Sequence, residues 1–284
     1  MSSSDDRYTI PFDRLPPGFA ESLDRTPDPP AAPRPAATIV MLRDGPAGVE
    51  TLLLRRTRRA GFVPGAWVFA GGRVDAGDGE AEAVARLEGL DPRDAAERLG
   101  LREDADPSAA AYYVAALREA FEETGLLVGH GPTGAPAPSA GEDPGVETIR
   151  DRLLADEITF GEALDALEVV VDGTAVEYVA HWITPIQEPR RYDTRFFAAR
   201  VDPEREVLLH PGEMTDALWL TPEDALVRHR DGSLPMVFPT IRTLEDMRGF
   251  TTADDLLDAF GAQAIPAILP RLVKTPTGVG LEIP

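Results

Sequence analysis

The stretch Leu117–Leu126, LREAFEETGL, carries three glutamates within five residues. These are Glu119, Glu122 and Glu123, and their spacing of i, i+3 and i+4 places them on one face of an α-helix. Like charges so placed repel by roughly a few tenths of a kcal/mol per pair. A compensating cation is therefore expected. Hard divalent ions such as Mg²⁺ or Mn²⁺, which prefer oxygen ligands, fit this requirement.

The helix that carries these glutamates is predicted to run from about residue 107 to residue 124. Asp106 suits its N-cap, with Pro107 in the first turn. Gly125 suits a left-handed C-terminal cap. The acidic cluster thus falls in the last turns, where the helix dipole favours cations over anions.

A solvated acidic face is the simple alternative to a metal site. Leu117, Phe121 and Leu126 provide apolar anchoring around the glutamates, and a Gly71-Gly72 pair lies upstream. Glycine allows the backbone to approach a metal ion or a phosphate closely. These features favour the metal site over the solvated face.

Residues 118–126 resemble the second half of the Nudix box, whose pattern ends R-E-U-x-E-E-x-G-U, where U is apolar. The first half of that box is a glycine, five residues and a glutamate. Here Gly72 is followed six positions later by Asp78, which is an acid but not a glutamate. Between Asp78 and Arg118 stand 39 residues where the family has seven, which indicates an insertion of 32 residues. The split leaves the role of Asp78 open.

Three further stretches can be compared with known Nudix proteins, and two of them resemble the coenzyme A diphosphatase (Nudix motif 19-like) subgroup of this family. Two are the W-I-T-P of residues 182–185 and the R-Y-D-T-R-F-F of residues 191–197. The third matches part of a coenzyme A pyrophosphatase signature, at Leu52, Leu53, Arg56, Gly65, Phe69, Gly71 and Gly72. It departs from that signature at Leu54, Thr57, Gly61 and Ala70. This partial match leaves coenzyme A specificity open.

The resemblance implies a fold class of α/β (α+β), as an α/β/α sandwich around a mixed sheet with an added, mostly helical insertion. We expect a Pro-rich N-terminal arm over residues 1–35, a Nudix hydrolase domain over 36–265 with helical insertions at about 79–106 and 129–170, and a C-terminal tail over 266–284.

Hydrophobic patterning predicts the main elements of that domain. Strands are expected over residues 36–42, 49–54, 177–184 and 194–201. Helices are expected as two short segments within 80–101, two within 147–167, and closing segments over 240–247 and 253–260. Thr221 is expected to cap another helix that has Pro222 at its first position.

Composition excludes several classes of protein. The formal net charge of −21 and the pI near 4.5 argue against binding to the nucleic-acid backbone. The absence of cysteine excludes disulfides, thiolate metal sites and a cysteine nucleophile. The sequence shows neither a signal-peptide pattern nor an apolar run of the ~18 residues that span a membrane. We therefore expect a cytoplasmic protein.

Other candidate site residues lie outside the acidic stretch. Arg56 and Arg58 belong to a basic cluster and could bind substrate phosphates, as could Arg195. The pair Gly71 and Gly72 is assigned to the same substrate site. In the implied fold, Glu213 fits a loop acid that binds metal or accepts a proton from water; an exposed loop glutamate is the simple alternative.

The resemblance implies hydrolysis of a diphosphate linkage, with Mg²⁺ or Mn²⁺ as cofactor. The metal ligands would be Glu119, Glu122 and Glu123, together with Gly72, and Arg118 would orient the carboxylates. Coenzyme A or an acyl-coenzyme A is our first choice of substrate. ADP-ribose, NADH and dinucleoside polyphosphates are alternatives, as is a catalytically weak nucleotide sensor. We expect a small-molecule partner, no nucleic acid, no membrane and a possible homodimer.

Overall fold

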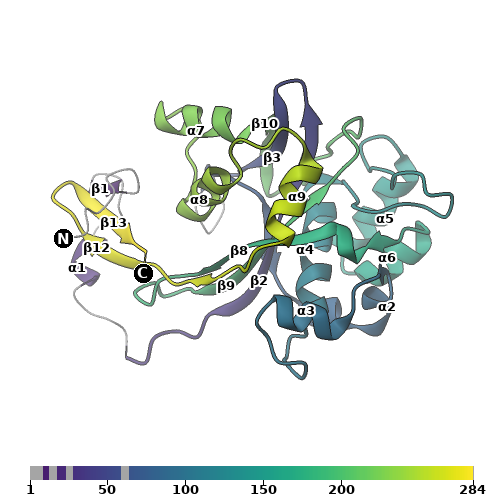
Figure 1. Ribbon diagram of the computed structural model, residues 1–284, viewed down its shortest axis with the longest axis horizontal. Helices are drawn as coiled ribbons and strands as arrows, with labels where there is room; N and C mark the ends of the chain where they lie inside the picture. The colour runs from purple at the N-terminus through teal and green to yellow at the C-terminus, as the bar shows by residue number, and fades with distance from the viewer. Residues whose placement is uncertain (1–8, 13–17, 24–27, 59–63, 284) are drawn as a thin grey trace. The chain divides into compact units, whose positions relative to one another are not determined.

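The computed structural model describes residues 9–12, 18–23, 28–58 and 64–283, which form two compact units (Figure 1). The larger unit comprises residues 36–180 and 195–265. The smaller unit comprises residues 181–194 and the described parts of 1–35 and 266–284. None of the helices in the described part of the chain has the length and apolar character that crossing a bilayer requires.

The larger unit is built on a β-sheet whose strands follow the order β10-β3-β2-β9-β8. Strand β3 pairs antiparallel with both β2 and β10, while β4 adds to β3 and β5 adds to β2. The strands are β2 (Arg34–Gly45), β3 (Gly48–Arg56), β4 (Trp67–Val68), β5 (Ala70–Arg73), β8 (Val176–Ile183), β9 (Tyr192–Arg200) and β10 (Met214–Leu220). The four strands predicted from hydrophobic patterning are confirmed. Their predicted and observed ends differ by one or two residues, except that β2 continues to Gly45, three residues beyond the predicted end at residue 42.

Both faces of this sheet are buried. Ile39 and Met41 of β2 belong to the core cluster that includes helix α4 (Ala109–Thr124). Val40, which lies between them, is equally buried, and the same alternation recurs over residues 52–54 of β3. Since successive residues of a strand point to opposite faces, apolar side chains cover the sheet on both sides.

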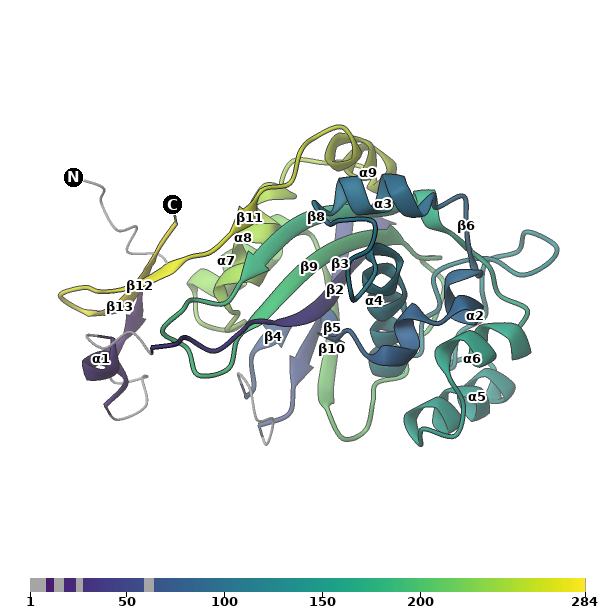
Figure 2. The same cartoon turned by 90° about the horizontal axis from the view of Figure 1, so that it is seen from below.

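Helices cover the two faces. Helix α4 packs beside β5, and α7 (Pro222–Arg230) packs against β3, β10 and α8 (Phe238–Asp246). In both views α7 and α8 lie on the other side of β2 and β3 from α4 (Figures 1 and 2). The predicted α/β/α sandwich around a mixed sheet is therefore confirmed. The closing helices are confirmed as α8 and α9 (Ala253–Gly261).

Helix α4 begins later than predicted and ends as predicted. Ser108, not Asp106, is its N-cap, because Ser108 Oγ accepts a hydrogen bond from the Ala111 N–H over 3.3 Å. At the other end Gly125 has a φ of 71° and donates its N–H to the Phe121 carbonyl over 2.9 Å. This left-handed conformation costs glycine least, and the helix ends at Thr124, the residue before it.

The first insertion is less helical than predicted. It follows the 3₁₀ turn η3 (Ala76–Gly79) and contains α2 (Ala81–Val84), β6 (Leu87–Glu88) and α3 (Pro92–Arg98). Helix α2 is only a single turn. The chain after it does not continue as a helix, because Leu87 forms a strand that pairs in parallel with Val171 of β7 (Val171–Asp172). Tertiary pairing thus overrides local helix propensity here.

The second insertion is helical as predicted. It contains α5 (Pro144–Leu154) and α6 (Phe160–Ala166), and β7 with the 3₁₀ turn η4 (Gly173–Ala175) follows. Thr159 caps α6 by accepting from the Glu162 N–H over 3.2 Å. The β6–β7 pair joins the first insertion to the end of the second.

The smaller unit contains a three-stranded sheet of order β1-β13-β12. Its elements are β1 (Ile10–Pro11), α1 (Phe19–Ser22), β11 (Ala267–Ile268), β12 (Arg271–Lys274) and β13 (Gly278–Glu282). Strand β11 pairs in parallel with the end of β8 at His181 and Trp182. Part of the predicted arm is thus paired with part of the predicted tail. The division into arm, domain and tail stays a prediction.

Candidate active site

Helix α4 carries its three glutamates in the last two turns. Arg118 Nη1 donates to Glu119 Oε1 over 3.0 Å and to Glu122 Oε2 over 3.1 Å. Glu123, which is 3% exposed, accepts from the backbone N–H of Gly71 over 3.3 Å. The structure thus gathers the three carboxylates between one arginine and the glycine pair of β5.

The glycine pair leaves no room for larger residues. A Cβ at Gly72 would overlap the Glu119 carboxylate, and a Cβ at Gly71 would overlap Thr38 and the Ala37 carbonyl of the neighbouring strand. Both positions lie on β5, which pairs with β2 beside α4. The absence of side chains here lets the strand backbone reach the carboxylates directly.

Asp78 lies beside Arg118 despite the insertion that separates them in sequence. Arg118 Nε donates to Asp78 Oδ1 over 2.8 Å, and Nη2 donates to Asp78 Oδ2 over 3.1 Å and to the Arg73 carbonyl over 2.9 Å. Burial alone would lower the pKa of Arg118, but the hydrogen bond to Asp78 and the charges of the surrounding carboxylates raise that pKa. The two halves of the split box therefore meet in space.

The acidic cluster is short of positive charge. Burial raises the pKa of Glu119 to about 7, although Arg118 opposes the shift. Burial also raises the pKa of Glu122. Burial and then the charge of Glu119 raise the pKa of Glu123 well above its ordinary value. Arg118 also pairs with Asp78, so its guanidinium does not compensate the charges of all three glutamates.

The loop before β10 lies along the end of α4 and carries Glu213. The N–H of Leu208 donates to the Thr124 carbonyl over 2.8 Å, and the N–H of His210 donates to the Glu123 carbonyl over 3.0 Å. Thr57 at the end of β3 donates its N–H to the Glu213 carbonyl over 2.8 Å. The charge of Glu213 contributes to raising the pKa of Glu123. Glu213 thus belongs to the same electrostatic cluster, with an exposed side chain.

Arg56, in the last position of β3, is the second cation of the cluster. Its charge opposes the rise in the pKa of Glu123. Its Nε atom is buried and has no hydrogen-bond partner within the described residues. Arg58 is exposed, and Arg59 and Gly61 lie outside the described residues. A buried guanidinium N–H without a partner suits an anionic ligand.

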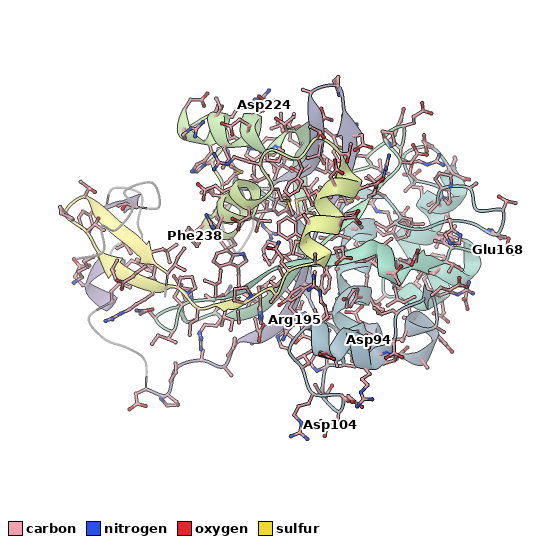
Figure 3. All side chains as sticks on the ribbon, viewed as in Figure 1. Asp94, Asp104, Glu168, Arg195, Asp224 and Phe238 are labelled. Atoms are coloured by element: carbon pink, nitrogen blue, oxygen red, sulfur yellow. The ribbon has the colours of Figure 1, made fainter. Side chains whose placement is uncertain are left out.

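The structure does not bring Arg195 to this cluster. Arg195, labelled in Figure 3, is 3% exposed and its guanidinium stacks on the Tyr112 ring, 4.3 Å from the ring centroid. Its Nη2 also donates to the Leu99 carbonyl over 3.5 Å. Tyr112 precedes Glu122 by ten residues on α4, which is ~15 Å along a helix axis. The contacts of Arg195 are those of a packed side chain, and its role in substrate binding stays a prediction.

The carboxylates are not arranged around a metal position as they stand. Within the described residues, no three acidic or histidine side chains converge closely enough to hold an ion. The hydrogen bonds engage one oxygen each of Glu119, Glu122 and Glu123. The second oxygen of each has no hydrogen bond within the described part of the chain. Although the side chains do not converge, their free carboxylate oxygens and their uncompensated negative charge are of the kind that a hard divalent cation binds.

Comparison with known proteins identifies the family. Residues 31–247, well over half of the chain, match the family model of the NUDT19 Nudix domain. The chain belongs to the NUDT19 subgroup of the Nudix hydrolases. It is accordingly an enzyme, a Nudix-type pyrophosphohydrolase.

Relatives in this subgroup are similar over most of the chain. The human acyl-coenzyme A diphosphatase NUDT19 is 28% identical over 291 residues, covering 91% of this chain and 74% of the human protein. The chicken acyl-coenzyme A diphosphatase NUDT19 is 29% identical over 245 residues, covering 75% of this chain and 64% of the chicken protein. The chain therefore spans just under two thirds of the chicken relative. A crystal structure of a NUDIX hydrolase from Alicyclobacillus acidocaldarius has 30% identity and a TM-score of 0.61, covering 80% of this chain and 96% of that one.

One residue at the Nudix box has no counterpart in the sequence predictions. Arg150 of α5 is 2% exposed and contacts the end of α4. Its signal in the sequence is a charged residue on the same helical face as Val146 and Leu153, both of which are buried. Sequence patterning would assign that face to the core, and a charge there requires a specific partner.

Proposed function

We propose that this Nudix hydrolase cleaves the diphosphate linkage of coenzyme A or an acyl-coenzyme A with the help of Mg²⁺ or Mn²⁺. The observation that carries the proposal is the gathering of three α4 carboxylates: Arg118 holds Glu119 and Glu122, and the Gly71 N–H holds Glu123. The substrate is supported by the names of the human and chicken relatives, which are acyl-coenzyme A diphosphatases. The cytoplasmic location and the possible homodimer stay predictions.

In this proposal Glu119, Glu122 and Glu123 would hold the metal through the oxygens that their hydrogen bonds leave open, together with the backbone of Gly72. A bound divalent cation supplies charge neutralisation for the diphosphate and a lower pKa for a water molecule. It would also relieve the excess negative charge that raises the pKa of Glu119 and Glu123.

The other residues of the cluster orient and bind. Arg118 fixes the carboxylates of Glu119 and Glu122 through Nη1, and Asp78 fixes Arg118 from the opposite side. Arg56 would donate to a phosphate of the substrate through its unpartnered Nε, and the exposed Arg58, two residues further along the chain, would add positive charge.

Glu213 completes the proposed reaction by accepting a proton from the attacking water. The water oxygen forms a bond to one phosphorus as the bond from that phosphorus to the bridging oxygen breaks. Two phosphate monoesters leave: adenosine 3′,5′-bisphosphate, and the 4′-phosphate of the pantetheine or acyl-pantetheine moiety. Two observations support this role: the Glu213 side chain is exposed, and its charge contributes to raising the pKa of Glu123.

The test is a hydrolysis panel of coenzyme A, an acyl-coenzyme A, ADP-ribose, NADH and diadenosine tetraphosphate, each with Mg²⁺ or Mn²⁺. The wild type runs beside Glu122→Gln and a control, Glu147→Gln, which alters an exposed glutamate of α5. We expect cleavage of coenzyme A or its acyl form that Glu122→Gln loses and Glu147→Gln retains. Preferred cleavage of another compound would overturn the substrate assignment. Tight nucleotide binding without turnover would identify a sensor instead.

A further inference from the structure

The carbonyl groups at the C-terminal end of α4 have partners from three separate segments. Backbone carbonyls in the last turn of a helix have no partner within the helix and need donors from elsewhere. The loop before β10 supplies N–H groups to Glu123 and Thr124, and Ala140 donates its N–H to the Gly125 carbonyl over 2.9 Å. The Phe121 carbonyl accepts from Gly125, as the cap requires.

The Glu122 carbonyl is the exception, because its donors come from a side chain. Arg150 Nη2 donates to it over 2.6 Å, and Arg150 Nε donates over 3.2 Å while also reaching the Phe121 carbonyl over 2.9 Å. The N–H of Leu126, which would continue the helical ladder to Glu122, donates to Thr124 Oγ1 over 3.1 Å instead. Arg150 therefore completes the hydrogen bonding of the residue that carries a central carboxylate of the cluster.

Arg150 also places a positive charge at the C-terminal end of α4. The C-terminus of a helix carries partial negative charge, and α4 adds three carboxylates in the same turns. Burial lowers the pKa of the Arg150 guanidinium, while the charges of Asp151, Glu147 and Glu122 oppose that shift. Arg118 faces the carboxylates from the side-chain direction, and Arg150 faces the same turn from its carbonyl end.

We propose that Arg150 is a positioning residue for the reaction, holding the last turn of α4 so that the Glu122 carboxylate is correctly aimed. A residue of the second insertion, which lies outside the split Nudix box, would thus support the active site. The inference rests on the proposed function, because it assigns Glu122 a part in metal binding. It does not require Arg150 to touch the metal or the substrate.

The second insertion contacts the end of α4 at another point, which supports this role. Besides the bond from Ala140 to Gly125, Glu142 accepts from Arg205 Nη1 over 3.0 Å and from Ser139 Oγ over 3.0 Å. Arg205 belongs to the same loop that reaches Glu213. The insertion therefore joins the end of α4 to the loop that carries the proposed proton acceptor.

The experiment compares Arg150→Gln and Arg150→Lys with a matched control, Arg152→Gln. Arg152 lies on the same helix, is exposed, and has a 3.7 Å contact with Glu157. For Arg150→Gln we expect kcat and Mn²⁺ affinity to fall by ~10- to 100-fold, with KM within about twofold of wild type. Lysine keeps the charge but not the fork of donors, so intermediate values are expected for Arg150→Lys. Arg152→Gln should equal wild type.

A second readout does not depend on activity or on metal. Hydrogen exchange of the metal-free proteins should show faster exchange in the segment 121–128 for Arg150→Gln and no change there for Arg152→Gln. Titration calorimetry with Mn²⁺ in a Glu122→Gln background should show little further loss of affinity on adding Arg150→Gln, because both changes disable the same ligand.

A purely structural role would give a different pattern. Arg150→Gln would then melt at a lower temperature, but kcat and Mn²⁺ affinity of the folded fraction, measured below that temperature, would equal wild type; this overturns the inference. Should Arg150→Gln not fold, wild-type values for Arg150→Lys would overturn it equally. A wild type that hydrolyses no diphosphate would refute the proposed function, and the Mn²⁺ and hydrogen-exchange comparisons would still decide whether Arg150 positions Glu122.

Discussion

Arg118 and Asp78 form a two-pronged ion pair, with N–O distances of 2.8 and 3.1 Å, although 39 residues separate them in the sequence. The pair lies almost fully buried, with Asp78 at 2% exposure. The two halves of the Nudix box are thus in contact in the folded protein, although the first insertion separates them in the sequence. The shorter aspartate side chain is sufficient for the contact, because η3 carries it close to α4.

Breaking this pair should destabilise the protein strongly. Asp78→Asn would leave the buried Nε and Nη2 groups of Arg118 without their charged partner, and we expect a loss of about 3–5 kcal/mol in the free energy of unfolding. Urea denaturation measures this change. The control is Asp104→Asn, which removes an exposed ion pair with Arg102 and should cost about 0–1 kcal/mol. Equal stabilities of the two variants would contradict the structural role assigned to Asp78.

A side chain at position 72 should disturb the proposed metal site. Gly72→Ala would displace the Glu119 carboxylate, so we expect Mn²⁺ affinity and activity to fall by ~10-fold or more. Gly77→Ala is the matched control, because a Cβ there meets no atom within 4 Å. Titration calorimetry and hydrolysis rates test both variants. Wild-type metal binding by Gly72→Ala would show that Glu119 is not a ligand.

The raised pKa of Glu119 predicts how stability depends on pH in the metal-free protein. Its folded pKa is about 7, above the ordinary 4.5, so the folded state keeps a proton that the unfolded chain has lost between these values. The contribution of this group to stability is therefore present at low pH and is lost as pH rises through that window. Relative to wild type, Glu119→Gln should gain about 3 kcal/mol at pH 8 and little at pH 4.

Urea denaturation in a chelator at several pH values measures this difference. Because a divalent cation replaces the missing positive charge, Mn²⁺ should stabilise the wild type more at pH 8 than at pH 5. A stability difference between wild type and Glu119→Gln that does not change with pH would show that Glu119 titrates normally.

Arg56 should contribute to substrate binding. Arg56→Met removes a guanidinium whose Nε has no partner within the described residues, and we expect KM to rise by ~10- to 100-fold through the loss of a charge-assisted hydrogen bond. Steady-state kinetics on coenzyme A measures it. Arg230→Met, which alters an exposed arginine of α7, is the control. An unchanged KM would remove Arg56 from the substrate site.

The sequence was sufficient to predict the parts of the site that depend on local geometry. The spacing of Glu119, Glu122 and Glu123 defines one helical face, and Gly125 ends that helix, so both follow from residues within one stretch. Apolar runs such as residues 36–42 and 49–54 likewise predicted the strands of the sheet.

Features that depend on distant contacts were not predictable in the same way. Arg150 reaches backbone carbonyls 28 and 29 residues away, and carbonyls leave no mark on the sequence. Asp78 lies beyond the insertion, so its partner could not be assigned from spacing. Leu87 forms a strand because Val171 is beside it, and Arg195 packs on Tyr112, a contact that its charge alone does not indicate.

Hydrolysis of an acyl-coenzyme A in ¹⁸O-labelled water, with Mn²⁺, tests the central claim most directly. Mass spectrometry of the products locates the label. The account predicts one ¹⁸O in the newly formed phosphate monoester of one of the two products for the wild type, and a rate lower by ~100-fold or more for Glu122→Gln. Label outside the phosphate groups, or equal rates for the two proteins, would contradict metal-dependent attack of water on phosphorus at the α4 glutamates.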